Sequence, residues 1–185
     1  KVKRNEEEDY ITYTVKDKAG NISEVCKKAI RITDIVTTIS GVLKGDNLHL
    51  TKDRSPYLVV ADCNVTETDT LVIEPGVEVR FDGEFCISVS GEINARGTKD
   101  EKILFTSNSI DKETYWTGIA INGSSVTVNN SNEYVSGNIM EYCEVEYSDA
   151  PLTVKAGAYI NNCKFSKAIE HDPNSWEYND YGHVS

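Results

Sequence analysis

Pairs of apolar residues separated by one position recur along this chain, and their spacing restricts its possible folds. Such pairs begin at Tyr57, Leu71, Ile87, Ile103 and Ile119, so the steps along the chain are 14, 16, 16 and 16. Alternation with a period of two is typical of strands, and self-similarity at a regular step is typical of repeat proteins. The pattern predicts a solenoid of short strands from about residue 37, in which Leu71 pairs with Ile87 one coil later.

The segment "TLVIEPGVEVRFDG" (residues 70–83) shows how one coil is expected to turn. Apolar residues alternate on both sides of Glu74, Pro75 and Gly76, which a central strand would not contain. The segment therefore predicts two strands on successive faces of one coil, with these three residues as the corner between them.

A second repeat is visible in the residues themselves. "NIMEYCEVEYSDA" and "AYINNCKFSKAIE" align at an offset of 20, which places Met140 on Ile160, Cys143 on Cys163 and Val145 on Phe165. Parallel in-register stacking aims both cysteine side chains the same way, so we expect thiols although a disulfide is conceivable at that separation. None of the five cysteines forms a C-x-x-C pair, which makes a zinc site an unfavoured interpretation.

Residues 1–36 have a different pattern. "YITYTVKD" and "ISEVCKKAIRITD" alternate on either side of the turn signal "KAGN", which predicts a β-hairpin. The amino-acid sequence of this hairpin resembles the last hairpin of bacterial immunoglobulin-like surface modules. Two strands do not make a sandwich, so we expect a partial module or a cap, followed by a second domain over residues 37–185.

Charge narrows the possible partners. The chain has 30 acidic and 19 basic residues and a formal net charge of −11, which argues against nucleic acid and anionic membranes. No apolar run is long enough to predict membrane insertion. The sequence starts at Lys1 without a signal peptide, and we interpret it as a piece of something larger that continues past residue 185.

A series of short sequence motifs shows a family resemblance. "SPYLV", "LVIEPGVEVRFDG", "GEINARGT", "ILFTSN" and W-x-G-I follow one another between residues 39 and 121, and weaker rungs extend to about residue 170. Together they resemble right-handed parallel β-helix domains of large secreted and surface-attached bacterial proteins. The resemblance implies an all-β, single-stranded right-handed parallel β-helix and an extracellular or cell-surface location. The sequence departs from it in the spacing of the apolar pairs, which is short for a three-sheet coil.

Many polysaccharide lyases and hydrolases resemble this fold, and their chemistry uses clustered or paired acids. Glu78 and Arg80 are expected outward on a strand, where solvation or pairing explains them. Asp82 precedes a glycine, as in many turns. Asp111 and Glu113 lie in the loop "NSIDKETYW" and are the candidate calcium ligands. No other cofactor is expected, and no histidine has a catalytic neighbour in sequence.

Exposed aromatic side chains are candidate carbohydrate-binding residues, because they stack on sugar rings. Tyr115 and Trp116 end the loop insertion, and Trp176 and Tyr178 lie in "NSWEYNDYGH". Trp116 also fits the W-x-G-I phrase, where the indole would instead cover the edge of a coil.

The function hypotheses follow from these features. The first is a non-catalytic scaffold, adhesion or carbohydrate-contacting segment, whose partner is a polysaccharide or another surface protein. The alternative is the opening part of a lyase-like or hydrolase-like enzyme, marked by acids gathered on one sheet or by bound calcium. A third is the subunit of a self-assembling fibre, in which open strand edges pair between chains.

Overall fold

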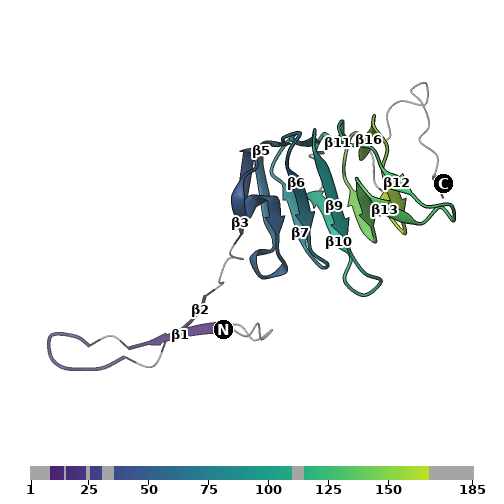
Figure 1. The fold of residues 1–185 in the computed structure, drawn as a ribbon. Coiled ribbons are helices and arrows are strands. Elements are labelled where there is room, and N and C mark those ends of the chain that lie inside the picture. The colour runs from purple at the N-terminus through teal and green to yellow at the C-terminus, as the bar shows by residue number, and fades with distance from the viewer. Residues whose placement is uncertain (1–8, 15, 24–25, 31–35, 110–114, 167–185) are drawn as a thin grey trace, which may run out of the picture. The chain divides into compact units, whose positions relative to one another are not determined.

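The computed structural model describes residues 9–14, 16–23, 26–30, 36–109 and 115–166 (Figure 1). The chain divides into two compact units, Lys1–Ile35 and Val36–Ser185. In the first unit, β1 (Asp9–Tyr13) pairs antiparallel with β2 (Cys26–Ile30). The two strands form a hairpin, as the alternation predicts. Its immunoglobulin-like character stays a prediction.

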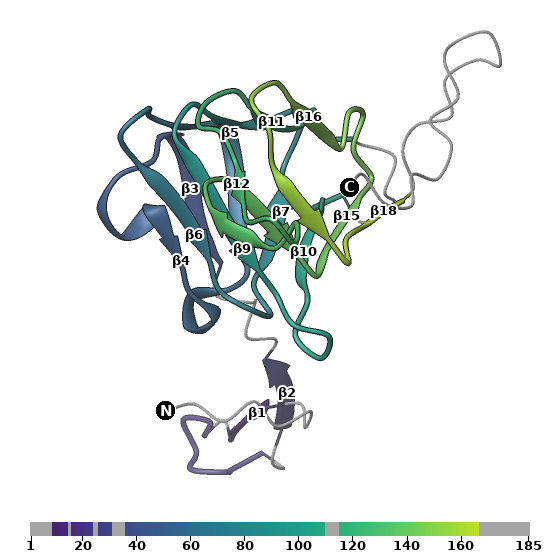
Figure 2. The same ribbon diagram turned by 45° about the vertical axis from the view of Figure 1, so that its right-hand side comes forward.

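The second unit is a parallel β-helix whose strands wind through three faces (Figure 2). Face 1 contains the first half of β3 (Thr37–Val42), the first half of β5 (Tyr57–Val65), β7 (Glu78–Phe81), β10 (Ile103–Ser107), β15 (Cys143–Glu146) and β18 (Lys164–Ser166). Face 2 contains the second halves of β3 and β5, followed by β8 (Cys86–Val89), β11 (Gly118–Ile121) and β16 (Leu152–Val154). Face 3 contains β4 (His49–Leu50), β6 (Thr70–Ile73), β9 (Glu92–Arg96), β14 (Ile139–Glu141) and β17 (Tyr159–Asn161).

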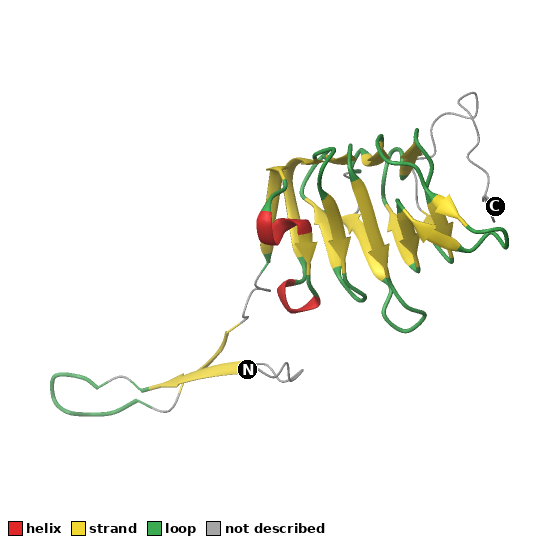
Figure 3. Cartoon of the chain, in the orientation of Figure 1, coloured by secondary structure: helices red, strands yellow, loops and turns green. Residues whose placement is uncertain are grey.

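Two kinds of element interrupt this winding. The 3₁₀ helices η1 (Gly45–Leu48) and η2 (Lys52–Arg54) lie in the corners of the first coil (Figure 3, red). An antiparallel ribbon of β12 (Thr127–Val128) and β13 (Tyr134–Ser136) is inserted between face 2 and face 3 of a later coil. No helix in the part of the chain that the structure describes is long and apolar enough to cross a membrane.

The coil period differs from the predicted one. Tyr57 pairs with Val79, and Leu71 pairs with Ile93, so one coil separates positions 57 and 79, and likewise 71 and 93. The prediction that Leu71 pairs with Ile87 is therefore wrong. Each coil holds three strands, so the first three of the shorter steps each advance two faces, and the last step, from Ile103 to Ile119, advances one.

The predicted corner is confirmed. β6 belongs to face 3 and β7 to face 1, so Glu74, Pro75 and Gly76 connect two faces of one coil. Gly76 has a φ of 76°, a left-handed conformation that glycine adopts without steric cost. The corner is closed by the Val77 backbone N–H, which donates to the Glu74 carbonyl at 3.3 Å.

The later alignment at an offset of 20 is also confirmed. Met140 pairs with Ile160, and Val145 pairs with Phe165. Cys143 and Cys163, which this register stacks, are free thiols. Hydrogen bonding between the two thiols, together with burial, raises the pKa of Cys143.

The interior of the β-helix is a column of buried aliphatic and aromatic side chains. Alternate residues of β6, β7, β8 and β9 point into it, such as Val79 and Phe81 on β7. The coil from Phe105 to its partner Val145 contains the β12–β13 ribbon and is longer than the next coil, from Val145 to Phe165. Insertions are thus added at corners without disturbing the ladders on the faces.

Candidate functional site

A row of polar side chains covers the outside of face 1. Alternate residues of β7 and β15 are buried, so the intervening residues point outward, and on β10 the half-buried Leu104 and the buried Thr106 occupy the corresponding positions. Parallel neighbours in such a row are about 4.8 Å apart, so side chains of adjacent strands contact one another. We call this surface the lateral polar face. Its polar residues are Glu78, Arg80, Asp82, Thr106, Asn108, Glu144, Glu146 and Lys164, and the apolar Leu104 lies between Glu78 and Glu144.

Arg80 and Glu78 form a bidentate pair along one strand. The Arg80 Nε donates to Glu78 Oε1 at 2.8 Å, and the Nη2 donates to Oε2 at 3.0 Å. Parallel hydrogen bonds of this kind hold both planar groups in one orientation. The sequence predicts these residues to be solvated or paired, and the structure pairs them with each other.

The other carboxylates of this face also accept hydrogen bonds from neighbours. Asp82 Oδ1 accepts from the Asn108 amide at 2.9 Å, and Glu146 Oε1 accepts from the Thr106 hydroxyl at 3.0 Å. Lys102 Nζ lies 2.7 Å from Oε1 of Glu144. The lateral polar face is therefore an array of oriented acceptors in which each carboxylate is already held by a donor.

Two tyrosines border this surface at the corner after the strands of face 1. The ring centroids of Tyr115 and Tyr147 are 6.4 Å apart and the planes are tilted by 55°. Both side chains are half-buried, and the Trp116 backbone N–H donates to the Tyr147 carbonyl at 3.3 Å. The sequence indicates Tyr115 but not Tyr147, because their proximity depends on which coils are neighbours.

Trp116 does not belong to this surface, and its prediction as a binding residue is wrong. The side chain is fully buried, and its ring stacks on Phe81 with centroids 3.8 Å apart and planes 7° from parallel. Its Nε1 donates to the Glu146 carbonyl at 2.9 Å. A buried indole needs such a partner. The alternative interpretation, an indole that covers a coil, is the one that the structure favours.

The remaining predicted residues lie outside the described residues. They are the proposed calcium ligands Asp111 and Glu113 and the aromatic residues Trp176 and Tyr178. Within the described ranges, no three His, Cys, Asp or Glu side chains gather so that they could hold a metal ion. Calcium binding therefore stays a prediction. His49, the histidine that the structure describes, lies on face 3 with Nε2 3.1 Å from Glu74 Oε1.

A second polar cluster, on face 3, anchors the β12–β13 ribbon. The Arg96 guanidinium carbon lies 5.7 Å from the ring centroid of Tyr134, and Arg96 Nε lies 3.2 Å from Glu141 Oε2. The Tyr134 ring also contacts Tyr159 at 5.8 Å, and its hydroxyl donates to the Gly137 carbonyl. Burial, with a smaller contribution from nearby Glu92, raises the pKa of Tyr134. These groups satisfy one another, so the cluster is a structural contact.

Comparison with known proteins adds one finding. The sequence model of a family described as "Pectate-lyase like beta helix domain" matches residues 41–149. This range includes the strands that carry the lateral polar face. The description indicates a carbohydrate-related protein and supports the predicted β-helix resemblance. No curated protein and no solved structure matches the chain.

Proposed function

Because the chain belongs to the family of pectate-lyase-like β-helix domains, we propose that it is a non-catalytic, carbohydrate-contacting scaffold of an extracellular or cell-surface protein. The lateral polar face is the proposed contact surface. Its strands lie side by side over several coils, and an extended polysaccharide has a similarly long, repetitive surface.

The pairing of the carboxylates is the observation that supports this proposal. Glycoside hydrolysis needs one carboxyl group to protonate the leaving oxygen and a second to act as base or nucleophile. On this face Glu78 is bidentate to Arg80, Glu144 holds Lys102, and the two other carboxylates accept from an amide and a hydroxyl. Such groups present fixed acceptors to sugar hydroxyls, which is a binding arrangement.

The tyrosine pair supplies the apolar part of the contact. Sugar rings have faces of C–H groups that pack against aromatic rings, while their hydroxyls bond to polar side chains. Tyr147 follows Glu146 directly in the chain, and its ring contacts that of Tyr115, so one oligosaccharide can contact both kinds of group.

Binding and turnover measured together test the proposal. The whole chain is applied to a glycan array, and each bound polysaccharide is then incubated with it and assayed for new reducing ends and for unsaturated products. We expect retention without turnover. Release of either product would show an enzyme and would refute the proposal, and so would the absence of any bound glycan.

A tyrosine variant tests the surface. Tyr147→Ala combined with Tyr115→Ala is expected to weaken glycan binding by at least about tenfold, since a stacking contact contributes roughly 1 kcal/mol per ring. Tyr142→Ala is the matched control. Like Tyr147, Tyr142 is half-buried and has a positive φ (49° for Tyr142 and 56° for Tyr147), so both substitutions have similar backbone consequences. Equal loss in the control would contradict the assignment.

A further inference from the structure

We infer that Cys143 and Cys163 form a redox-active pair, in which Cys163 attacks an external disulfide and Cys143 then completes a cross-link between two neighbouring coils. The structure shows the reduced pair, since both cysteines are free thiols. Neither residue belongs to the lateral polar face, so the pair would act independently of the proposed function.

The ladder between β15 and β18 places the two thiols side by side. Glu144 pairs with Lys164, so Cys143 and Cys163 stack where these strands begin (Figure 2). Parallel neighbours are about 4.8 Å apart, which is within the range of about 4.4 to 6.8 Å between Cα atoms that a disulfide bridges. The thiols hydrogen bond to each other, so the two sulfurs are in contact before any reaction.

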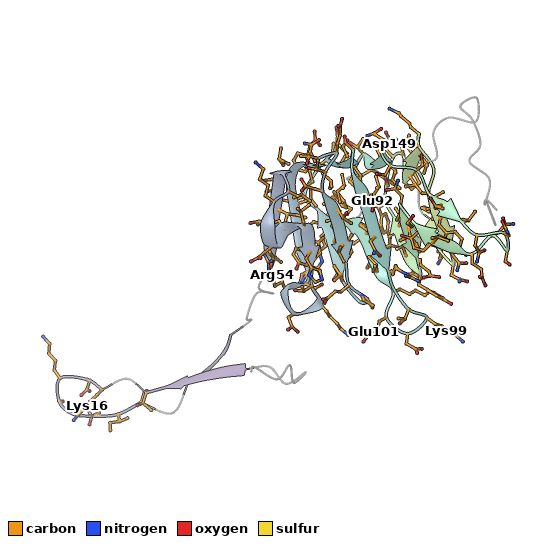
Figure 4. All side chains as sticks on the ribbon, viewed as in Figure 1. Lys16, Arg54, Glu92, Lys99, Glu101 and Asp149 are labelled. Carbon is orange, nitrogen blue, oxygen red and sulfur yellow. The ribbon has the colours of Figure 1, made fainter. Side chains whose placement is uncertain are left out.

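The two thiols differ in exposure. Cys143 is fully buried, and its Sγ lies 3.6 Å from the carbonyl oxygen of Ala95, on β9 of the preceding coil. Its side chain points into the β-helix, unlike outward side chains such as Glu92 of β9 (Figure 4). Cys163 is half-buried. A reagent in solution would therefore reach Cys163 before Cys143.

Burial also determines which sulfur becomes the thiolate, the form that attacks disulfides. A charged sulfur is less stable in the interior than at a half-buried position. Hydrogen bonding to Cys163 and burial both raise the pKa of Cys143, and the hydrogen bond from the Cys143 thiol lowers the pKa of Cys163. Cys163 is thus the attacking thiol and Cys143 the resolving thiol.

The reaction with a small disulfide, R–S–S–R, consists of two exchanges. The Cys163 thiolate attacks one sulfur of the small disulfide and releases RS⁻, which leaves a mixed disulfide on Cys163. Cys143 then gives its proton to water and attacks the Cys163 sulfur, which releases the second RS⁻. Two protein thiols are thereby oxidised to one disulfide, and the two electrons reduce R–S–S–R to two R–SH.

The cross-link requires a small movement of β18. Parallel stacking aims the two side chains the same way, so the Cys163 side chain has to rotate. A disulfide also needs Cβ atoms about 3.5 to 4.5 Å apart, so β18 has to approach β15 by roughly 0.3 to 1 Å. Among the described strands, β18 pairs with β15 alone, so no ladder described on its other side opposes this movement. The cross-link would then hold β18 in its ladder wherever the environment is oxidising.

Oxidised glutathione is the small disulfide that tests this pair. The whole chain is incubated with it, blocked with iodoacetamide, digested with trypsin and mapped by mass spectrometry, because cleavage after Lys155 separates the two cysteines. We expect one cross-link, between Cys143 and Cys163, that dithiothreitol reverses. Hydrogen exchange in residues 164–166 should slow by at least about tenfold in the cross-linked form, since β18 is then tied to β15.

Single variants assign the two roles. Cys143→Ala should retain glutathione on Cys163 as a mixed disulfide, because the resolving thiol is missing. Cys163→Ala should add glutathione to Cys143 at least about tenfold more slowly, because the remaining thiol is buried. Cys86→Ala is the matched control, since Cys86 is half-buried like Cys163. It should leave the cross-link and its rate of formation unchanged.

Three results would overturn the inference. They are the absence of the cross-link in the wild-type chain, a cross-link between other cysteines, and equal rates of glutathione addition in the Cys143→Ala and Cys163→Ala variants. None of these measurements involves a glycan, so the thiol pair and the proposed function can fail separately.

Discussion

Replacement of Asn138 should test how the ribbon insertion is built into the β-helix. Asn138 is fully buried, and its Oδ1 accepts from the Ile93 backbone N–H at 3.0 Å. Its Nδ2 donates to the carbonyls of Gly123, Ser124 and Gly157 at 2.9, 2.8 and 3.2 Å. One amide thus connects both ends of the inserted segment to the coils before and after it.

The magnitude follows from these contacts. Asn138→Ala removes an acceptor and two donor hydrogens, and each lost hydrogen bond costs about 1 kcal/mol of net stability. The Ile93 N–H is left inside the β-helix without its acceptor, which adds about 1 to 3 kcal/mol. We therefore expect the free energy of unfolding to fall by about 4 to 6 kcal/mol. In a unit of this size the melting temperature should fall by roughly 10 °C.

Urea denaturation followed by far-ultraviolet circular dichroism measures the loss, and hydrogen exchange locates it. Exchange should accelerate first in residues 123–138, because these are the residues that the amide holds. Asn94→Ala is the control, since Asn94 lies next to Ile93 but points outward from β9. We expect a change within about 0.5 kcal/mol there. A loss below about 1 kcal/mol for Asn138→Ala would refute the reasoning.

Three further predictions concern the core and the thiols. Trp116→Ala should lower the free energy of unfolding by about 3 to 5 kcal/mol in the same urea assay, because a fully buried ring stack is lost; a loss below about 1 kcal/mol would contradict the buried position. Gly123→Ala should lower the free energy of unfolding by about 3 kcal/mol, because a Cβ there would lie 1.6 Å from the Ser90 carbonyl oxygen. An unchanged urea midpoint would show that the backbone at Gly123 does not approach Ser90 so closely. Burial raises the pKa of Cys63 to about 12, so this thiol stays protonated in the folded state after the unfolded thiol has ionised near pH 9. The protonated Cys63 thiol should therefore contribute to the free energy of unfolding below pH 9, and this contribution should be lost as the pH rises toward 12. Cys63→Val should abolish this pH-dependent loss of stability. In labelling with iodoacetamide, the half-buried Cys86 should react before Cys63.

Part of the candidate site follows from the sequence alone. Alternation on β7 predicts that Glu78 and Arg80 point outward, and the loop before Trp116 predicts an insertion near Tyr115. Alternation cannot show that Arg80 binds Glu78 through both Nε and Nη2, because side-chain rotamers depend on neighbouring strands. Nor can it identify Tyr147, whose ring reaches Tyr115 from a segment far away in the sequence.

The strands and the corner between them can be read from residues close together in the chain. Period-two alternation specifies strands with one buried side, and proline and glycine at Glu74–Gly76 specify a corner, because both effects depend only on residues close in the chain.

Which strands become neighbours depends on contacts between coils. The corners absorb insertions of different length, so the long coil from Phe105 to Val145 and the short one from Val145 to Phe165 align in one ladder. Hydrogen bonding between coils selects the register that buries the inward side chains. That selection places Leu71 on Ile93, moves Trp116 into the core and brings the carboxylates of neighbouring coils onto one face.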